Sequence, residues 1–151
     1  MMKAYIEKSW PVHDFYSIVK PKLIMGIMGL RNMSKDGLND LKLRLRDFAE
    51  ARDWDQFHSP KNLSMALSAE VAEIVEHFQW LTEEQSKSLP DNKLDEVETE
   101  LADTLIYLIR LADKLDIDLL AAAISKIEVN ERKYPVSKAK GNAKKYTELD
   151  R

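Results

Sequence analysis

Apolar residues recur at steps of three and four over most of the chain, which is the spacing of one face of an α-helix. This pattern predicts an all-α protein with four main helices, over residues 38 to about 53, 60 to about 80, 93 to 114 and about 117 to 134. The apolar residues expected to be buried are, for the first three helices in turn, Leu38, Leu41, Leu45, Phe48 and Ala49; Leu63, Leu67, Val71, Ile74, Val75 and Phe78; and Leu94, Val97, Leu101, Leu105, Leu108 and Leu111.

Several residues mark where these helices begin and end. Ser59-Pro60 places an N-cap serine before a proline at the first helical position, where its missing N–H costs nothing. Thr82-Glu-Glu-Gln85 has the form of a capping box and predicts a short helical turn, which Pro90 interrupts. Asp91 is the predicted cap of the third helix, and Pro135 ends the fourth.

The chain divides into three segments that differ in residue composition and hydrophobic periodicity. Residues 1–36 have scattered prolines, glycines and aromatic residues without a sustained period, and they predict an N-terminal extension of unknown role. Residues 37–135 form the predicted helical domain, and the polar residues 136–151 form a tail that we expect to wrap or to be flexible rather than helical. A length of 151 residues with 44% hydrophobic content suits one compact domain.

Charge and composition exclude several classes of function. The net charge of −3 argues against binding of a nucleic-acid polymer. The absence of cysteine excludes disulfides and thiolate metal sites and fits a reducing compartment. The longest apolar run, Leu23–Leu30, is too short to span a membrane. We therefore expect a cytoplasmic protein with no membrane partner.

Two pairs of acids stand at helical spacing in the second and third helices: Glu70-x-x-Glu73 and Glu100-x-x-Asp103. Residues three apart lie on one face of a helix, so antiparallel packing would bring all four carboxylates together. No Lys or Arg stands three or four residues from any of them. Because an unpaired buried charge is costly, the arrangement predicts a site for a hard cation such as Mg²⁺.

Two alternatives apply to these acids. They could be solvated surface residues, which is the usual role of a single Glu-x-x-Glu pair. They could also hold a di-iron centre, but such centres typically use Glu-x-x-His, which is lacking in this sequence. Glu96, one turn before Glu100, is the best candidate for a further ligand.

Aromatic and basic residues flank the acids. Trp54 and His58 precede the second helix and Trp80 closes it, and Tyr107 stands one turn after Asp103. They could be rim residues of the core or could contact a nucleoside, since aromatic faces stack on any base. In the fourth helix the corresponding candidates are Lys126, Asn130 and Lys133, which could be solvated or could bind phosphates.

Several motifs occur together in one order: Arg52–His58, Pro60–Leu63, Phe78–Trp80, Leu105–Tyr107, Ile124–Lys126, Tyr134–Pro135 and Lys145–Thr147. With the two acid pairs, they make residues 38–149 resemble the all-α nucleoside triphosphate pyrophosphohydrolases of the MazG-like superfamily, and within it the dCTP pyrophosphatase branch. The chain departs from the family at Thr99, where an acid is common, and at Glu131, where relatives can have a basic residue.

The resemblance implies a four-helix-bundle-like homodimer or homotetramer that hydrolyses a nucleoside triphosphate to the monophosphate and pyrophosphate. It implies dCTP or a related pyrimidine dNTP as substrate, a house-cleaning role, and Mg²⁺, or alternatively Mn²⁺, held by the catalytic Glu70, Glu73, Glu100 and Asp103. It places Trp54, Trp80, His58 and Tyr107 near the nucleoside and Lys126, Asn130 and Lys133 near the phosphates. A noncatalytic nucleotide-sensing or interaction module with the same fold is the alternative.

Overall fold

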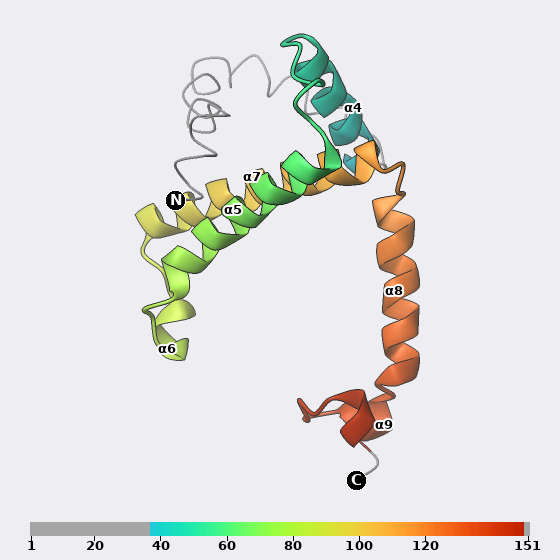
Figure 1. Ribbon diagram of the computed structural model, residues 1–151. Coiled ribbons are helices and arrows are strands. Elements are labelled where there is room, and N and C mark those ends of the chain that lie inside the picture. The colour runs from blue at the N-terminus through green and yellow to red at the C-terminus, as the bar shows by residue number, and fades with distance from the viewer. Residues whose placement is uncertain (1–36, 150–151) are drawn as a thin grey trace. The chain divides into compact units, whose positions relative to one another are not determined.

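The computed structural model describes residues 37–149 and shows an all-α protein, as predicted (Figure 1). The predicted extension, residues 1–36, and the last two residues lie outside the described part. The helices are α4 (Gly37–Glu50), α5 (Pro60–Phe78), α6 (Glu83–Ser86), α7 (Asp91–Lys114), α8 (Leu119–Lys133) and α9 (Val136–Ala139), followed by a 3₁₀ turn (Tyr146–Glu148). The chain divides into two compact units, with the boundary in the sequence between Leu115 and Asp116, and each unit is described by itself.

Two of the predicted helix starts are confirmed. The Ser59 side chain accepts a hydrogen bond of 3.2 Å from the Asn62 N–H, with Pro60 as the first residue of α5. In α6, the Thr82 hydroxyl accepts from the Gln85 N–H and the Gln85 side chain accepts from the Thr82 N–H. This reciprocal pair is the predicted capping box.

Other predicted helix ends are shifted. Asp91 is the first residue of α7 rather than its cap, because Pro90 takes the N-cap position with extended backbone. The Pro90 carbonyl accepts from the N–H groups of Lys93 and Leu94. The first helix ends at Glu50, a few residues early, because the chain then turns through Asp53, whose φ of 54° is left-handed and ends the helical path.

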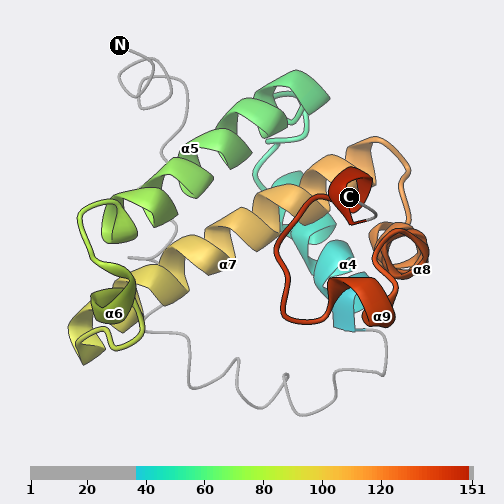
Figure 2. The same ribbon diagram turned by 90° about the horizontal axis from the view of Figure 1, so that it is seen from below.

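In the first unit, α5 and α7 lie side by side and antiparallel, and α4 packs against α7 (Figures 1 and 2). The small core contains residues from all three helices: Leu45, Ala49, Leu63, Ala66, Val97, Ile109 and Ala112. This antiparallel pairing sets the middle of α5 against the middle of α7, where the two acid pairs stand.

Part of the predicted core is exposed. The exposed fraction is between 41% and 55% for Val71 and Val75 of α5 and for Leu94, Leu101 and Leu105 of α7. The prediction that one chain buries these residues is wrong because each helix has an apolar stripe wider than the contact it makes within the described part of the chain. The uncovered stripes give this unit an apolar outer surface.

The second unit begins with α8, whose first turn is capped by the Asp118 carboxylate accepting from the Ala121 N–H. The tail predicted to be without helix forms α9 and the 3₁₀ turn. The Tyr146 ring packs edge-on against Tyr134, with centroids 6.0 Å apart, and the Lys133 ammonium lies 4.9 Å from the Tyr146 centroid. None of the helices within residues 37–149 has both the length and the apolar content that crossing a membrane requires.

Candidate metal centre

The antiparallel pair brings three of the four predicted acids together. Glu70 of α5 is buried, and Glu100 and Asp103 of α7 are half-buried. Each offers a carboxylate oxygen, and these oxygens all lie within 4.8 Å of one another. We call these three residues the acid cluster. Glu73, one turn after Glu70, is half-buried and lies outside this set of three. Its charge nevertheless helps to raise the pKa of each of the three residues.

The acids repel one another at neutral pH. Burial, and then the charges of Asp103, Glu73 and Glu100, raise the pKa of Glu70 to about 8. Burial and the charge of Glu73 likewise raise the pKa values of Glu100 and Asp103. A carboxylate with a raised pKa is one whose ionised form lacks a compensating charge. The cluster therefore holds a proton at neutral pH unless a cation is present.

The acid cluster fits a divalent cation. Carboxylate oxygens are the ligands of Mg²⁺ and Ca²⁺, and opposite ligands of one Mg²⁺ are about 4.2 Å apart, close to the observed span. Among the ion pairs found in residues 37–149, none joins a Lys or Arg to Glu70, Glu100 or Asp103. Within the described residues, no basic side chain therefore compensates the charge of these acids.

Glu96, the predicted further ligand, is engaged elsewhere. Its carboxylate lies 2.6 Å from the Lys93 ammonium and 3.6 Å from His77 Nδ1. The hydrogen bond from Lys93 lowers the pKa of Glu96, the opposite of the shift in the acid cluster. Glu96 is therefore a surface ion-pair residue here, and the geometry does not add it to the ligand set.

Tyr107 borders the acid cluster from α7, one turn after Asp103. Burial, and then the charges of Glu70 and Asp103, raise the pKa of its hydroxyl above the ordinary range. Tyr107 consequently stays protonated at physiological pH and can donate a hydrogen bond beside the acids.

The two candidate tryptophans lie beyond opposite ends of α5. Trp54 is half-buried and packs edge-on against Phe48 of α4, with centroids 5.6 Å apart. Trp80 lies just beyond the C-terminal end of α5 and is 87% exposed. The 19 residues of α5 span about 28 Å. Within one chain, the two indoles are therefore far too widely separated to stack on both faces of one base.

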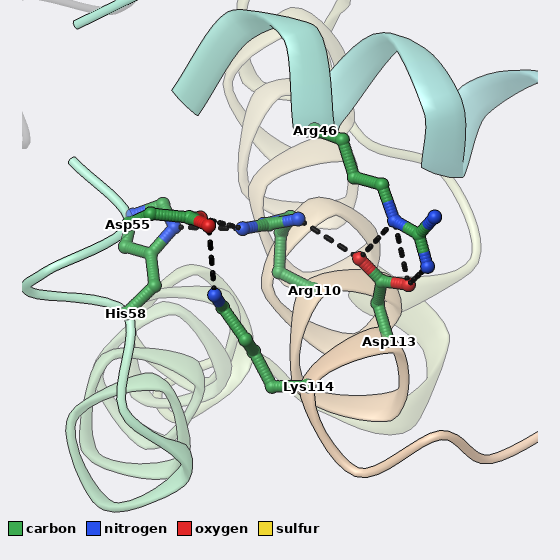
Figure 3. A network of polar contacts seen from close by, with 6 residues as sticks. All are labelled: Arg46, Asp55, His58, Arg110, Asp113 and Lys114. Atoms are coloured by element: carbon green, nitrogen blue, oxygen red, sulfur yellow. Dashed lines mark hydrogen bonds and ion pairs between the residues drawn. The ribbon is translucent and has the colours of Figure 1, made fainter. Parts of the chain in front are cut away.

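A buried arginine, Arg110, which is not among the predicted site residues, ties the α4–α5 loop (residues 51–59) to α7 (Figure 3). The Arg110 Nη2 atom lies 2.8 Å from Asp55 Oδ1 and 3.2 Å from His58 Nδ1. Its Nη1 atom lies 2.9 Å from Asp113 Oδ2. The six residues of this polar cluster, called here the Arg110 network, are Arg46, Asp55, His58, Arg110, Asp113 and Lys114.

The outer members of the Arg110 network complete its charge balance. The Lys114 ammonium lies 3.0 Å from Asp55, and the Arg46 Nε atom lies 2.9 Å from Asp113 Oδ2. These contacts lower the pKa values of both carboxylates, chiefly through the Lys114 hydrogen bond to Asp55 and the Arg46 hydrogen bond to Asp113. Burial, followed by the charge of Arg110, lowers the pKa of His58 to about 4.

One sequence signal could have pointed to Arg110. Asp103, Tyr107, Arg110 and Lys114 recur at steps of three and four, so they share a face of α7. Polar residues on the face that continues from the acid cluster are candidates for a buried network. The partners of Arg110 in the α4–α5 loop have no such periodic signal.

The three candidate phosphate-binding residues, Lys126, Asn130 and Lys133, lie on α8 in the second unit, where they are exposed. Their assignment to phosphates stays a prediction. The contact of Lys133 with the Tyr146 ring shows that the tail restrains at least one of these side chains.

The fold and the acid cluster define an all-α protein with a candidate divalent-metal centre between two antiparallel helices. Residues 65–149 match the MazG-like family. The chain is 44% identical to dCTP pyrophosphatase 1 of Mus musculus over 116 residues, which are 76% of this chain and 68% of that protein. It is 41% identical to the Homo sapiens protein of the same name over 114 residues, which are 74% and 67% of the two chains.

A solved structure agrees with this assignment. A pyrophosphatase from Archaeoglobus fulgidus superposes with a TM-score of 0.61 at 43% identity, and the match covers 64% of this chain and 91% of that one. The chain belongs to the MazG-like family, and the resemblance to the dCTP pyrophosphatase branch is confirmed.

Proposed function

We propose that this protein is a nucleoside triphosphate pyrophosphohydrolase that converts a dNTP and water into the dNMP and pyrophosphate, with dCTP or a related pyrimidine dNTP as the preferred substrate. In this reaction the water oxygen bonds to the α-phosphorus, and the bond from that phosphorus to the oxygen bridging the α- and β-phosphates breaks. The observation that carries the proposal is the convergence of Glu70, Glu100 and Asp103 from two helices, in a chain similar to dCTP pyrophosphatases. Removal of unwanted dNTPs from the nucleotide pool is the corresponding role.

The proposed metal ligands are Glu70, Glu100 and Asp103, with Glu73 as the fourth acid of the site. Mg²⁺ is the proposed cation and Mn²⁺ an alternative, since both accept carboxylate oxygens. When bound, such a cation would neutralise phosphate charge and lower the pKa of a coordinated water. The raised pKa of Glu70 supports this assignment, because the ionised cluster lacks a counter-charge.

The remaining assignments concern residues that are not proposed metal ligands. Glu73 is the proposed acceptor of the proton from the attacking water, as it is near the acid cluster but outside the set of three. Tyr107 is a protonated donor beside the acids. The proposed substrate contacts are Trp54, Trp80, His58 and Tyr107 for the nucleoside and Lys126, Asn130 and Lys133 for the phosphates.

A homodimer or homotetramer completes the proposal. The length of α5 separates Trp54 from Trp80, so a base held between two indoles would need one from each of two chains. The exposed apolar residues of α5 and α7 supply a surface for a second copy. A cytoplasmic location belongs to the same proposal, because a chain without cysteine suits a reducing compartment.

The test is to incubate the protein with Mg²⁺ and each dNTP separately and to resolve the products. Monophosphate with pyrophosphate, fastest for dCTP or another pyrimidine dNTP, is the expected result. Diphosphate with phosphate would refute the reaction proposed. Binding of a dNTP without turnover would favour a noncatalytic sensing module, a role that does not require the acid cluster.

A further inference from the structure

The contact between Arg110 and His58 determines which imidazole nitrogen carries a proton. The Arg110 Nη2 atom lies 3.2 Å from His58 Nδ1, and both side chains are buried. A guanidinium has five N–H donors, no acceptor, and a pKa too high to lose its proton in a protein. His58 Nδ1 must therefore be the acceptor of this bond, and it carries no hydrogen. In a neutral imidazole the one ring proton then lies on Nε2.

The surroundings keep that imidazole neutral. Within residues 37–149, the charged groups that act on His58 are Asp55 on its own loop and Arg110 and Lys114 on α7. Two of these three are cations, and one of them, Arg110, is itself bonded to Nδ1. Burial and the charge of Arg110 are the largest causes that lower the pKa of His58 to about 4, well below physiological pH.

Arg110 also fixes the loop that carries His58. One nitrogen, Nη2, binds both Asp55 and His58, which are three residues apart in the α4–α5 loop. Trp54 immediately precedes Asp55, so the anchor lies next to the proposed base-stacking indole. The loop is closed further by the Gln56 side chain, which donates to the Asp53 carbonyl, and by Asn62, which donates to the Phe57 carbonyl.

We infer that Arg110 is a positioning residue for nucleotide binding: it holds the Trp54–His58 segment on α7 and fixes His58 as the neutral tautomer whose Nε2 is a hydrogen-bond donor. The inference rests on the proposed function for its ligand. The Nε2 N–H of His58 can donate a hydrogen bond to an acceptor oxygen of the nucleotide, whether that oxygen belongs to the base, the sugar or a phosphate.

The tautomer can be tested without nucleotide. The chain has three histidines, His13, His58 and His77, so ¹⁵N-histidine labelling with a His58→Asn variant assigns the His58 signals. We expect an unprotonated Nδ1 and a protonated Nε2, with no second protonation above about pH 5. In Arg110→Met, the two tautomers should mix and the pKa of His58 should rise. A proton on Nδ1 in the unmodified protein would overturn the inference, as would an unchanged titration in Arg110→Met.

The effect on nucleotide binding is measured with dCTP carrying a methylene bridge between its α- and β-phosphates, which cannot be hydrolysed there. Calorimetric titration in Mg²⁺ should show dissociation constants at least about tenfold higher for Arg110→Met and for His58→Asn, equivalent to one lost charged or loop-anchoring contact. His58→Asn keeps an oxygen for Arg110 near the former Nδ1 position but lacks the Nε2 donor. Thermal unfolding should therefore show that this variant is folded.

Arg46→Met is the matched control. Arg46 is 52% exposed at its side chain and pairs with Asp113 at the far edge of the Arg110 network, so its removal leaves the His58 contact in place. We expect nucleotide affinity within about twofold of the unmodified protein. Arg110→Lys should recover part of the affinity, because an ammonium can donate to His58 but cannot match the bidentate geometry.

Each result separates the inference from the proposed function. Equal nucleotide affinity in Arg110→Met, His58→Asn and the unmodified protein would refute the positioning role even if dCTP is hydrolysed. Loss of affinity in those two variants, with the His58 tautomer as stated, would support the role even if the protein binds the analogue but hydrolyses no dNTP. Equal losses of nucleotide affinity in Arg46→Met and Arg110→Met would mean that the network only maintains the fold. This result would overturn the inference.

Discussion

Glu70 on α5 and Glu100 on α7 bring carboxylate oxygens within 4.8 Å of one another across the antiparallel helix pair. Burial and the charges of the neighbouring acids raise the pKa values of both residues, that of Glu70 to about 8. Ionised carboxylates this close repel one another, so the metal-free acid cluster retains a proton at neutral pH. A metal cation that binds the cluster would have to displace that proton.

Metal binding should therefore release a proton and depend on pH. The pKa of Glu70 is raised to about 8, so Glu70 is mostly protonated at neutral pH in the metal-free protein. Because the ligand form is ionised, the affinity for Mg²⁺ should rise between about pH 6 and about pH 8 and level off above that. Calorimetry near neutral pH, in two buffers with different ionisation enthalpies, should report roughly one proton released per cation bound.

The Glu70→Gln variant is the control for this measurement. Glutamine cannot lose a proton in this pH range. The number of protons released per cation should therefore fall close to the number that the remaining acids release, since their pKa values are raised less. Identical heats in the two buffers for the unmodified protein would show that no proton is displaced, and the assignment of Glu70 as a ligand would be wrong.

Neutralising one acid of the cluster should affect activity and stability in opposite directions. Asp103→Asn removes a proposed metal ligand and should lower kcat/KM for dCTP by at least about 100-fold. Loss of a group that only hydrogen-bonds to a metal ligand costs up to about 100-fold, so loss of a ligand itself should cost at least as much. The same change relieves like-charge repulsion, so the metal-free variant should unfold at a higher temperature than the unmodified protein at pH 8.

Glu76→Gln is the matched control, because Glu76 is an exposed acid on the same α5 helix as Glu70 and Glu73. Its kcat/KM should stay within about twofold of the unmodified protein. Full activity of Asp103→Asn would show that Asp103 is not a metal ligand. A lower unfolding temperature of this variant without metal would show that other interactions in the protein stabilise the ionised Asp103 carboxylate.

The acid cluster was predictable from sequence because helical spacing places Glu100 beside Asp103 and antiparallel packing places both opposite Glu70. The Arg110 network was not, because its contact with Asp55 joins residues 55 positions apart. No periodicity relates a residue in an irregular loop to one on a helix. The burial of Leu101 was wrongly predicted for a related reason: periodicity identifies the apolar face of a helix but not what covers it.

Asp113 should stabilise the fold through its buried pair with Arg110. The two side chains are only 5% and 4% exposed. Asp113→Ala leaves Arg110 without one of its partners and should lower the free energy of unfolding by about 3 kcal/mol, measured by urea denaturation. Replacing both residues, with Arg110→Met and Asp113→Leu, should cost less than the sum of the two single changes, because no buried charge is then left unpaired.

Arg46→Met provides the comparison at the exposed end of the same network. A half-exposed ion pair contributes little, so this variant should lose less than about 1 kcal/mol. Additive effects of Arg110→Met and Asp113→Leu would contradict the coupling, and a cost for Arg46→Met as large as that for Asp113→Ala would mean that burial does not control the strength of these pairs.

The separation of the two tryptophans by the length of α5 predicts that each nucleotide site uses two chains. Trp54→Ala and Trp80→Ala should each lower kcat/KM for dCTP about tenfold or more, since a base stacked on an aromatic ring gains about 1–3 kcal/mol. Trp80→Ala should leave the unfolding temperature unchanged because Trp80 is 87% exposed, whereas Trp54→Ala should lower it by removing the contact with Phe48. The Trp→Phe variants at both positions should retain most of the activity.

Mixing the two alanine variants distinguishes one chain from two. If one site takes Trp54 from one chain and Trp80 from its neighbour, a mixed two-fold dimer contains one intact site and one site lacking both indoles. Random reassociation of equal amounts should then restore about one quarter of the unmodified activity, well above either variant alone. If both indoles of a site came from the same chain, mixing would restore nothing, because neither chain carries both residues. Activity that stays at the level of the separate variants, under conditions in which labelled subunits are seen to exchange, would therefore rule out the shared site.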